Sequence, residues 1–161
     1  MIDDAERERL AALRAYRILD TEPEAAFDDL VMLASQICGT PVALISLVDS
    51  ERQWFKARTG TTLQETERGI AFCDHAIRHH GIFEIQDAAM DERFKDNPLV
   101  VTDPRIRFYT GAPLVTPEGH AIGTICVIDR HPRKHVGISD HLFSVPGSAH
   151  IKITNVCLIY T

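Results

Sequence analysis

A chain of 161 residues is long enough to bury one hydrophobic core and too short for two comfortable domains. Its composition, 45% hydrophobic and 25% charged, is ordinary for a soluble globular protein. The net charge of −6 argues against the phosphate-neutralising surface that nucleic-acid binding needs, so we expect no nucleic acid among its partners.

The sequence also predicts a cytoplasmic protein without membrane attachment. The N-terminus, Met-Ile-Asp-Asp, is acidic where a secretory signal would be basic. The longest apolar stretch, residues 42–48, is far shorter than the roughly 20 residues that span a bilayer. The cysteines, Cys38, Cys73, Cys126 and Cys157, are widely spaced and contain no Cys-x-x-Cys pair, so we expect free thiols.

Two helices are expected in the first quarter of the chain. Residues 4–16 are rich in Ala, Leu, Arg and Glu, with Leu10 and Leu13 at helical spacing. Thr21 to Glu24 matches a capping box for a second helix, which Gly39 ends. The apolar stripe of this second helix consists of Phe27, Leu30, Val31, Ala34, Ile37 and Cys38.

The pattern then changes to that of strands. Residues 42–48 and 53–58 predict a hairpin, and residues 59–68 predict a polar loop. Residues 70–80 predict a short helix, which Gly81 ends, and residues 82–85 a short strand.

The second half of the body predicts another hairpin. Residues 87–98 are irregular, and residues 106–114 and 121–128 are strong strands joined by a Pro-Glu-Gly turn. Two hairpins imply an antiparallel sheet whose faces the helices must cover, so we expect an α+β fold. Residues 134–161 differ in composition and carry no assignment.

A series of short strings runs in order through the body of the chain. They are Leu19-Asp20-Thr21, Ser46-Leu47-Val48-Asp49, Arg52-Gln53-Trp54-Phe55-Lys56, Phe72-Cys73-Asp74-His75-Ala76-Ile77, Asp91-Glu92-Arg93-Phe94, Gly111-Ala112-Pro113-Leu114 and Gly123-Thr124-Ile125-Cys126-Val127-Ile128-Asp129. Together they resemble the GAF family, in the version found at the N-terminus of bacterial sensor histidine kinases and diguanylate cyclases. The resemblance implies a sensory domain over residues 1–133, with a central antiparallel sheet of five or six strands and helices on both faces. One face is then expected to form a ligand pocket.

The resemblance also implies a role. We expect a small-molecule-sensing regulatory domain of a bacterial two-component or diguanylate-cyclase protein. GAF domains elsewhere bind cyclic nucleotides, tetrapyrroles, haem or small metabolites, so the ligand and any cofactor stay unknown. Because the chain carries no kinase or cyclase motif, we predict that it is not an enzyme.

Two alternatives to a ligand-sensing role remain open. The chain could instead be a dimerisation module without a ligand, or a free methionine sulfoxide reductase that uses Cys73 and Cys126. A homodimer through the first helix is expected, because the closing C-terminal helix of the family is missing from the sequence pattern.

Cys73 and His75 belong to the Phe-Cys-Asp-His string. Two residues apart on a helix, they point about 200° from one another and cannot bind one metal ion together. His75 and His79 share a helix face, but no third ligand accompanies them, so we expect no metal site. Cys73 is either a core thiol or a thiol in the pocket.

Other candidates lie on predicted strands and loops. Arg107 and Tyr109 alternate with apolar residues and share one strand face, which either binds an anionic ligand or is solvated and ion-paired. Asp87 belongs to the loop that roofs the pocket in family members. Trp54 and Phe55 are adjacent and point to opposite faces of the sheet.

Cys126 is expected on the same strand face as Ile122 and Thr124, with a core position as the default. The predicted ligand-binding residues are thus Trp54, Cys73, His75, Asp87, Arg107, Tyr109 and Cys126.

Overall fold

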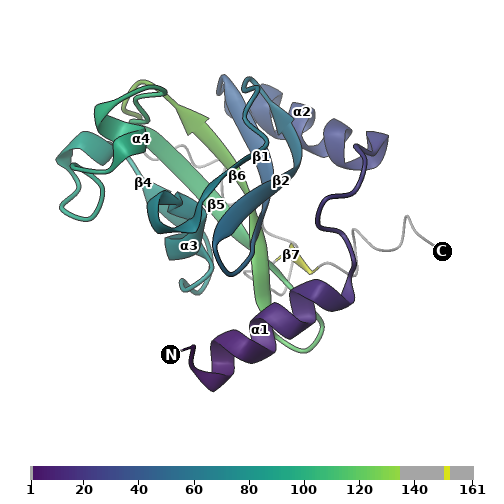
Figure 1. Cartoon of the computed structure of the whole chain (residues 1–161). Coiled ribbons are helices and arrows are strands. Elements are labelled where there is room, and N and C mark those ends of the chain that lie inside the picture. Colours follow the sequence, from purple (N-terminus) through teal and green to yellow (C-terminus); the bar gives the residue numbers. More distant parts are fainter. Residues whose placement is uncertain (1, 135–150, 153–161) are drawn as a thin grey trace.

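The computed structural model describes residues 2–134 and the short strand β7, Ile151–Lys152 (Figure 1). Most of the unassigned tail, residues 134–161, lies outside the described residues, and so does Cys157.

The chain is built on one sheet. In spatial order its main strands are β3 (Glu65–Glu67), β2 (Arg52–Thr59), β1 (Val42–Val48), β6 (Ala121–Asp129), β5 (Phe108–Val115) and β4 (Phe83–Ile85). Neighbours in this order are antiparallel, and β7 pairs in parallel with the end of β5. The predicted hairpins β1–β2 and β5–β6 meet through the central pair β1–β6, and the expected α+β fold is confirmed.

Helices cover both faces of this sheet (Figure 1). The long helix α2 (Ala25–Cys38) packs against β1, β2 and β6, and α3 (Phe72–Ala76) packs on the other face against β1, β5 and β6. Helix α1 (Asp4–Ala15) crosses the end of the sheet at β6. The short elements η1 (Arg68–Ile70), η2 (Ala88–Met90) and α4 (Pro98–Val101) complete the α3 side.

Three local predictions are corrected. The capping box does not start α2, because the Thr21 hydroxyl accepts a hydrogen bond from Lys56 Nζ at 2.7 Å and Glu24 pairs with the same ammonium at 2.6 Å. The helix expected over residues 70–80 contracts to the single turn α3. The loop expected over residues 59–68 contains β3, which pairs with Arg52 to Trp54 on β2.

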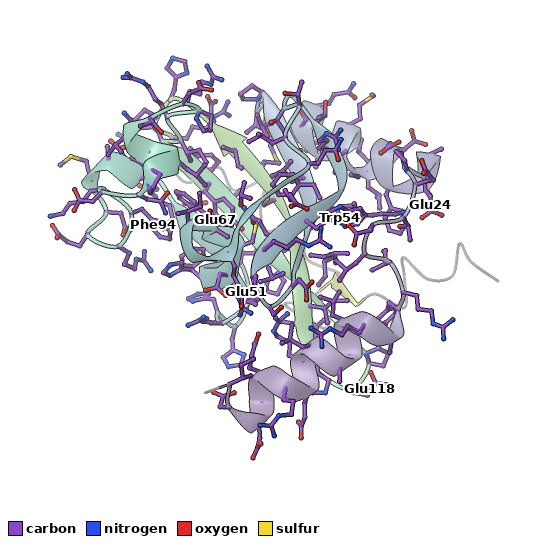
Figure 2. The ribbon with its side chains drawn as sticks, viewed as in Figure 1. Glu24, Glu51, Trp54, Glu67, Phe94 and Glu118 are labelled. Carbon is purple, nitrogen blue, oxygen red and sulfur yellow. The ribbon has the colours of Figure 1, made fainter. Side chains whose placement is uncertain are left out.

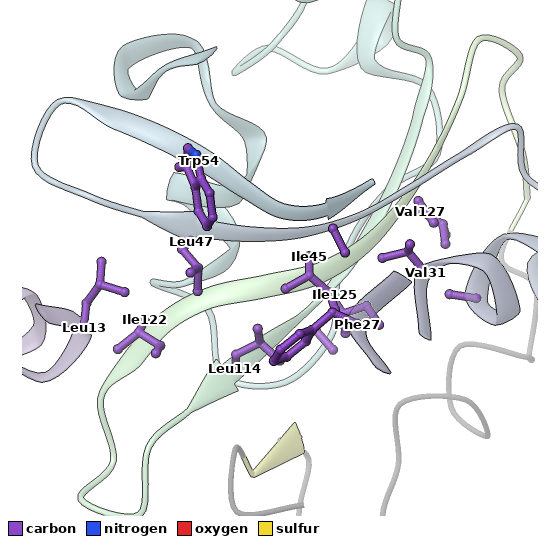
Figure 3. Close-up of a cluster of buried hydrophobic side chains, with 14 of the residues drawn as sticks. Leu13, Phe27, Val31, Ile45, Leu47, Trp54, Leu114, Ile122, Ile125 and Val127 are labelled. Carbon is purple, nitrogen blue, oxygen red and sulfur yellow. The ribbon is translucent and has the colours of Figure 1, made fainter. Parts of the chain in front are cut away.

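Two hydrophobic clusters fill the two sides of the sheet. The α2-face cluster comprises Leu13, Phe27, Val31, Ala34, Ala43, Ile45, Leu47, Trp54, Ala57, Phe108, Ala112, Leu114, Ile122, Ile125 and Val127 (Figure 3). The α3-face cluster comprises Leu44, Val48, Phe55, Phe72, Cys73, Ala76, Ile77, Phe83, Ile85, Ala88, Phe94, Val100, Ile106, Tyr109 and Cys126.

Two β-bulges decide which side chains reach which face. On β2, Lys56 is the extra residue between the pairs Ile45–Ala57 and Ser46–Phe55, and its ammonium lies 5.5 Å from the centre of the Phe27 ring. On β6, the register shift beside Leu114 leaves Ile122 in the α2-face cluster. The expectation that Ile122 shares a face with Cys126 is therefore wrong.

The apolar stripe of α1 is buried within the chain. Leu10 is 5% exposed and Leu13 is 0% exposed, so both pack against the sheet rather than project into solvent. A homodimer through this helix stays a prediction, and it would have to use the remaining surface of α1.

Candidate functional site

The centre of the α3-face cluster holds two cysteines from different elements. Cys73 comes from α3 and Cys126 from the central strand β6, and their sulfur atoms lie 4.0 Å apart. The Tyr109 hydroxyl donates a hydrogen bond to Cys73 Sγ at 3.3 Å, and the Thr124 hydroxyl donates one at 3.1 Å. All four residues are at most 2% exposed, so the group is buried.

The surroundings of the two thiols make them unequal. The hydrogen bond from Cys126, followed by those from Thr124 and Tyr109, lowers the pKa of Cys73 to about 7, although burial opposes the shift. The same bond to Cys73, together with burial, raises the pKa of Cys126 well above its ordinary value. Cys73 is therefore the thiol that ionises first.

A line of polar side chains runs from the thiols towards the surface. Ser46 on β1 contributes to the lowered pKa of Cys73. The Ser46 hydroxyl donates to Gln53 Oε1 on β2 at 3.1 Å. Gln53 Nε2 in turn donates to the Thr66 hydroxyl on β3 at 2.6 Å, where the side chain is partly exposed. These residues were missed from the sequence, although Ser46 is the polar residue inside the apolar run of residues 42–48.

Aromatic rings cover the thiols on the α3 side. Phe72 and Phe94 stack with their centres 4.2 Å apart, and the exposed His75 ring meets Phe94 edge-on at 4.7 Å. The Arg93 guanidinium lies 5.2 Å from the centre of Phe83 and pairs with Asp91 at 2.8 Å. Partial burial against these rings lowers the pKa of His75.

Arg68 links α3 to the first helix, α1. Its guanidinium pairs with Asp74 of α3 at 2.8 Å and with Glu6 of α1 at 2.5 Å, and it donates to the Asp49 carbonyl at 3.1 Å. Glu6 also pairs with Arg9 at 2.8 Å. Hydrogen bonds from Arg9 first, and then from Arg68, lower the pKa of Glu6 to about 2.

The structure gathers only part of the predicted ligand-binding set. Cys73, Tyr109 and Cys126 meet in the α3-face cluster, and His75 lies on the outer side of α3. Trp54 belongs to the α2-face cluster, on the other side of the sheet from Phe94 (Figure 2). The opposite orientations of Trp54 and Phe55 are as expected.

The side chains of two predicted residues form hydrogen bonds with nearby backbone groups. Asp87 accepts a hydrogen bond from the Ala89 N–H at 3.1 Å and caps η2. Arg107 precedes β5 and donates to the carbonyls of Val100 and Ile106, each at 3.0 Å. Arg107 thus stands just outside β5, and the strand face that it is expected to share with Tyr109 stays a prediction. Ligand binding by any of the predicted residues stays a prediction.

Within residues 2–134 and β7, no three His, Cys, Asp or Glu side chains come together as a metal site would require. The described thiols of Cys38, Cys73 and Cys126 are all free.

A comparison with protein-family models identifies the family of this chain. The GAF domain model matches residues 22–142. The chain belongs to the GAF family. The solved GAF domain of an Acinetobacter phosphoenolpyruvate-protein phosphotransferase has the same fold, with a TM-score of 0.60 at 15% identity, covering 88% of this chain and 87% of that one. A free methionine-R-sulfoxide reductase from Neisseria meningitidis matches with a TM-score of 0.56 at 18% identity, covering 88% and 84% of the two chains.

One curated relative is much nearer in sequence. A cyclic di-GMP phosphodiesterase of Pseudomonas aeruginosa is 45% identical over 128 residues, which are 80% of this GAF chain and 22% of the relative. The GAF chain thus spans about a fifth of that protein. The expectation that the protein is not an enzyme is contradicted, because this relative is named as one and methionine sulfoxide reductases share the fold.

In the part of the chain that the structure describes, every helix is too short or too polar to cross a membrane.

Proposed function

We propose that this GAF domain is the regulatory part of a bacterial enzyme that hydrolyses cyclic di-GMP. The observation that carries the proposal is the 45% identity to a cyclic di-GMP phosphodiesterase across 80% of the chain. Identity at this level over most of a domain supports a shared regulatory role, whereas the fold alone would not.

The geometry supports a route for this regulation. The α3 face carries the unequal thiols and the aromatic roof, and Arg68 pairs with α3 through Asp74 and with α1 through Glu6. A ligand or chemical change that moves α3 would alter these ion pairs and so the position of α1. Regulation requires that the effector bind the two arrangements with different affinity.

A chimera tests the proposal directly. In the P. aeruginosa phosphodiesterase, the 128 matching residues would be replaced by those of this chain, and hydrolysis of cyclic di-GMP would be measured. We expect the chimera to hydrolyse its substrate and Arg68→Ala to change the rate by roughly fivefold or more. Arg7→Ala is the matched control, because the Arg7–Asp4 pair is exposed and lies on α1 alone.

Equal rates for the chimera, the Arg68→Ala chimera and the Arg7→Ala chimera would contradict regulation through Arg68. Hydrolysis by the 161-residue chain itself, measured alongside, would instead assign the catalytic step to this domain.

Ligand sensing needs a separate test. We propose that the domain binds a small molecule on the α3 face, and thermal unfolding with cyclic nucleotides, haem, bilins and amino acids would detect it. A ligand at a hundred times its dissociation constant adds about 2.7 kcal/mol of stability. If no compound shifts the transition, the dimerisation module becomes the better explanation.

A further inference from the structure

We propose that Cys73 and Cys126 form a reversible disulfide when the protein meets hydrogen peroxide. The proposal rests on geometry: two free thiols from different elements face each other across 4.0 Å inside one cluster. It is independent of the proposed function, because the bond forms or fails to form within this chain whatever enzyme the domain regulates.

The contacts assign different roles to the two sulfur atoms. Cys73 Sγ lies 3.1 Å from the Thr124 hydroxyl and 3.3 Å from the Tyr109 hydroxyl, and both donate to it. Hydrogen bonds that stabilise a thiolate make it available as a nucleophile. Cys73 is thus the attacking thiol, and Cys126 is the resolving thiol.

The chemistry balances with peroxide as the oxidant. The Cys73 thiolate attacks one peroxide oxygen, the S–O bond forms, the O–O bond breaks, and hydroxide leaves with the electron pair. This hydroxide takes up the proton that the Cys73 thiol lost on ionisation, which gives the first water. Cys73 is then a sulfenic acid, oxidised by two electrons, and the peroxide is reduced. The Cys126 sulfur attacks Cys73, the S–S bond forms, and the S–O bond breaks. The second hydroxide takes the proton of Cys126, so two thiols and one peroxide give one disulfide and two waters.

The fold can accommodate the shortened distance. A disulfide has an S–S length of about 2.05 Å, so the sulfur atoms must approach by roughly 2 Å. Cys126 is fixed in a strand that pairs on both sides, with β1 and with β5. Cys73 lies in a helix of 5 residues outside the sheet, so α3 is the element that moves. Because Ser46, Gln53 and Thr66 already bond to one another, peroxide reaches the buried thiols through local opening of the short helix α3.

This movement reaches beyond the core. Asp74 follows Cys73 directly in the sequence and pairs with Arg68, which also pairs with Glu6 of α1. Disulfide formation would therefore displace one end of the connection between α3 and the terminal helix.

The test uses the 161-residue chain with Cys38→Ser and Cys157→Ser, which leaves Cys73 and Cys126 as its cysteines. The reduced, folded protein is treated with a moderate excess of hydrogen peroxide, quenched with catalase, denatured and alkylated. We expect the intact mass to fall by two hydrogen atoms, no alkylation, and a linked pair of peptides containing Cys73 and Cys126. Dithiothreitol should restore both thiols.

Two single variants in this background test the roles. With Cys126→Ser, Cys73 should stop at the sulfenic acid and be trapped by dimedone. With Cys73→Ser, Cys126 should stay reduced at the same dose. Circular dichroism confirms that each variant is folded, and the parent protein decides the matter if a variant is not.

Two outcomes would overturn the proposal. In one, both thiols stay reduced in the folded parent while the denatured chain is oxidised. In the other, Cys73 proceeds to the sulfinic acid while Cys126 remains alkylatable. Because every readout is a mass, failure here leaves the proposed regulation of a phosphodiesterase untouched.

Discussion

The two faces of the sheet are packed with different kinds of side chain. The α2-face cluster is mainly aliphatic and is covered by one helix of 14 residues (Figure 3). The α3-face cluster contains two thiols and several aromatic rings, and the elements that cover it, α3, η2 and α4, have 3 to 5 residues each. A long helix packs as a unit, whereas short segments can rearrange separately. The comparison suggests that the α2 face supplies stability and the α3 face supplies adaptable chemistry.

The largest expected effect is on the α2 face. Phe27 is 6% exposed and fills the space between α2 and the sheet, so Phe27→Ala should lower the free energy of unfolding by about 3–5 kcal/mol. Urea denaturation measures this loss. The matched control is Leu33→Ala on the same helix, where the side chain is 50% exposed and the change should stay within about 0.5 kcal/mol.

The corresponding change on the α3 face should cost less. Phe94 is 1% exposed, but the short segments around it can collapse into the space that Phe94→Ala leaves. We expect a loss of about 2–3 kcal/mol, below that of Phe27→Ala, because the cost of a cavity falls when its walls relax. Amide hydrogen exchange should show faster opening confined to residues 72–101. Equal losses and chain-wide opening in both variants would mean that the two faces are mechanically alike.

The same contrast explains how far the sequence could be interpreted. Residues with a strong period, such as Phe27, Val31 and Ala34 in α2, were predicted correctly, because a long helix repeats its apolar side several times. The β1–β2 and β5–β6 hairpins followed from two strand-like segments each. On the α3 side, helices and strands of 3 to 5 residues complete too few periods to be recognised, so β3 was missed and α3 was overextended.

The candidate site was only partly predictable for a related reason. Cys73, Tyr109 and Cys126 were named, but their convergence depends on pairing between distant elements. Trp54 was placed with them although it faces the other side, since a strand alone does not reveal which face meets which helix. Bulges at Lys56 and Ile122 shifted the alternation further, and their positions had no pattern in the sequence.

A smaller effect should come from the connection between the two regions of the fold. In the folded chain the pKa of Glu6 is lowered to about 2 from its ordinary value of 4.5. A lowered pKa contributes stability that is full above pH 4.5 and is lost as the pH falls through 2. Glu6→Gln should therefore cost about 1–2 kcal/mol near neutral pH, after allowance for solvent screening, and almost nothing at the acid end.

Urea denaturation of both proteins across this pH range would measure the difference. Glu8→Gln, on the exposed side of α1, removes the same charge and is the matched control. A gap between wild type and Glu6→Gln that does not shrink in acid would mean that Glu6 contributes through packing rather than through its charge.

The smallest change in stability is expected for Tyr109→Phe, which should also change the pKa of Cys73. Tyr109→Phe removes the hydroxyl that donates to Cys73 Sγ and leaves the ring in place. A single hydrogen bond to sulfur contributes little to folding, so we expect a loss below about 1 kcal/mol. The thiolate loses a donor, however, so the pKa of Cys73 should rise from about 7 towards its ordinary value of 9.0.

Thiolate absorbance in the ultraviolet, followed as a function of pH, measures this shift. Tyr16→Phe is the matched control, because Tyr16 packs against the α2-face cluster and lies away from the thiols. If Tyr109→Phe leaves the titration of Cys73 unchanged, the Tyr109 hydroxyl does not stabilise the thiolate. The α3 face would then differ from the α2 face in packing, but Tyr109 would not tune its thiol. A rise in the pKa with stability nearly intact would instead show that the hydroxyls of the α3 face act mainly on Cys73.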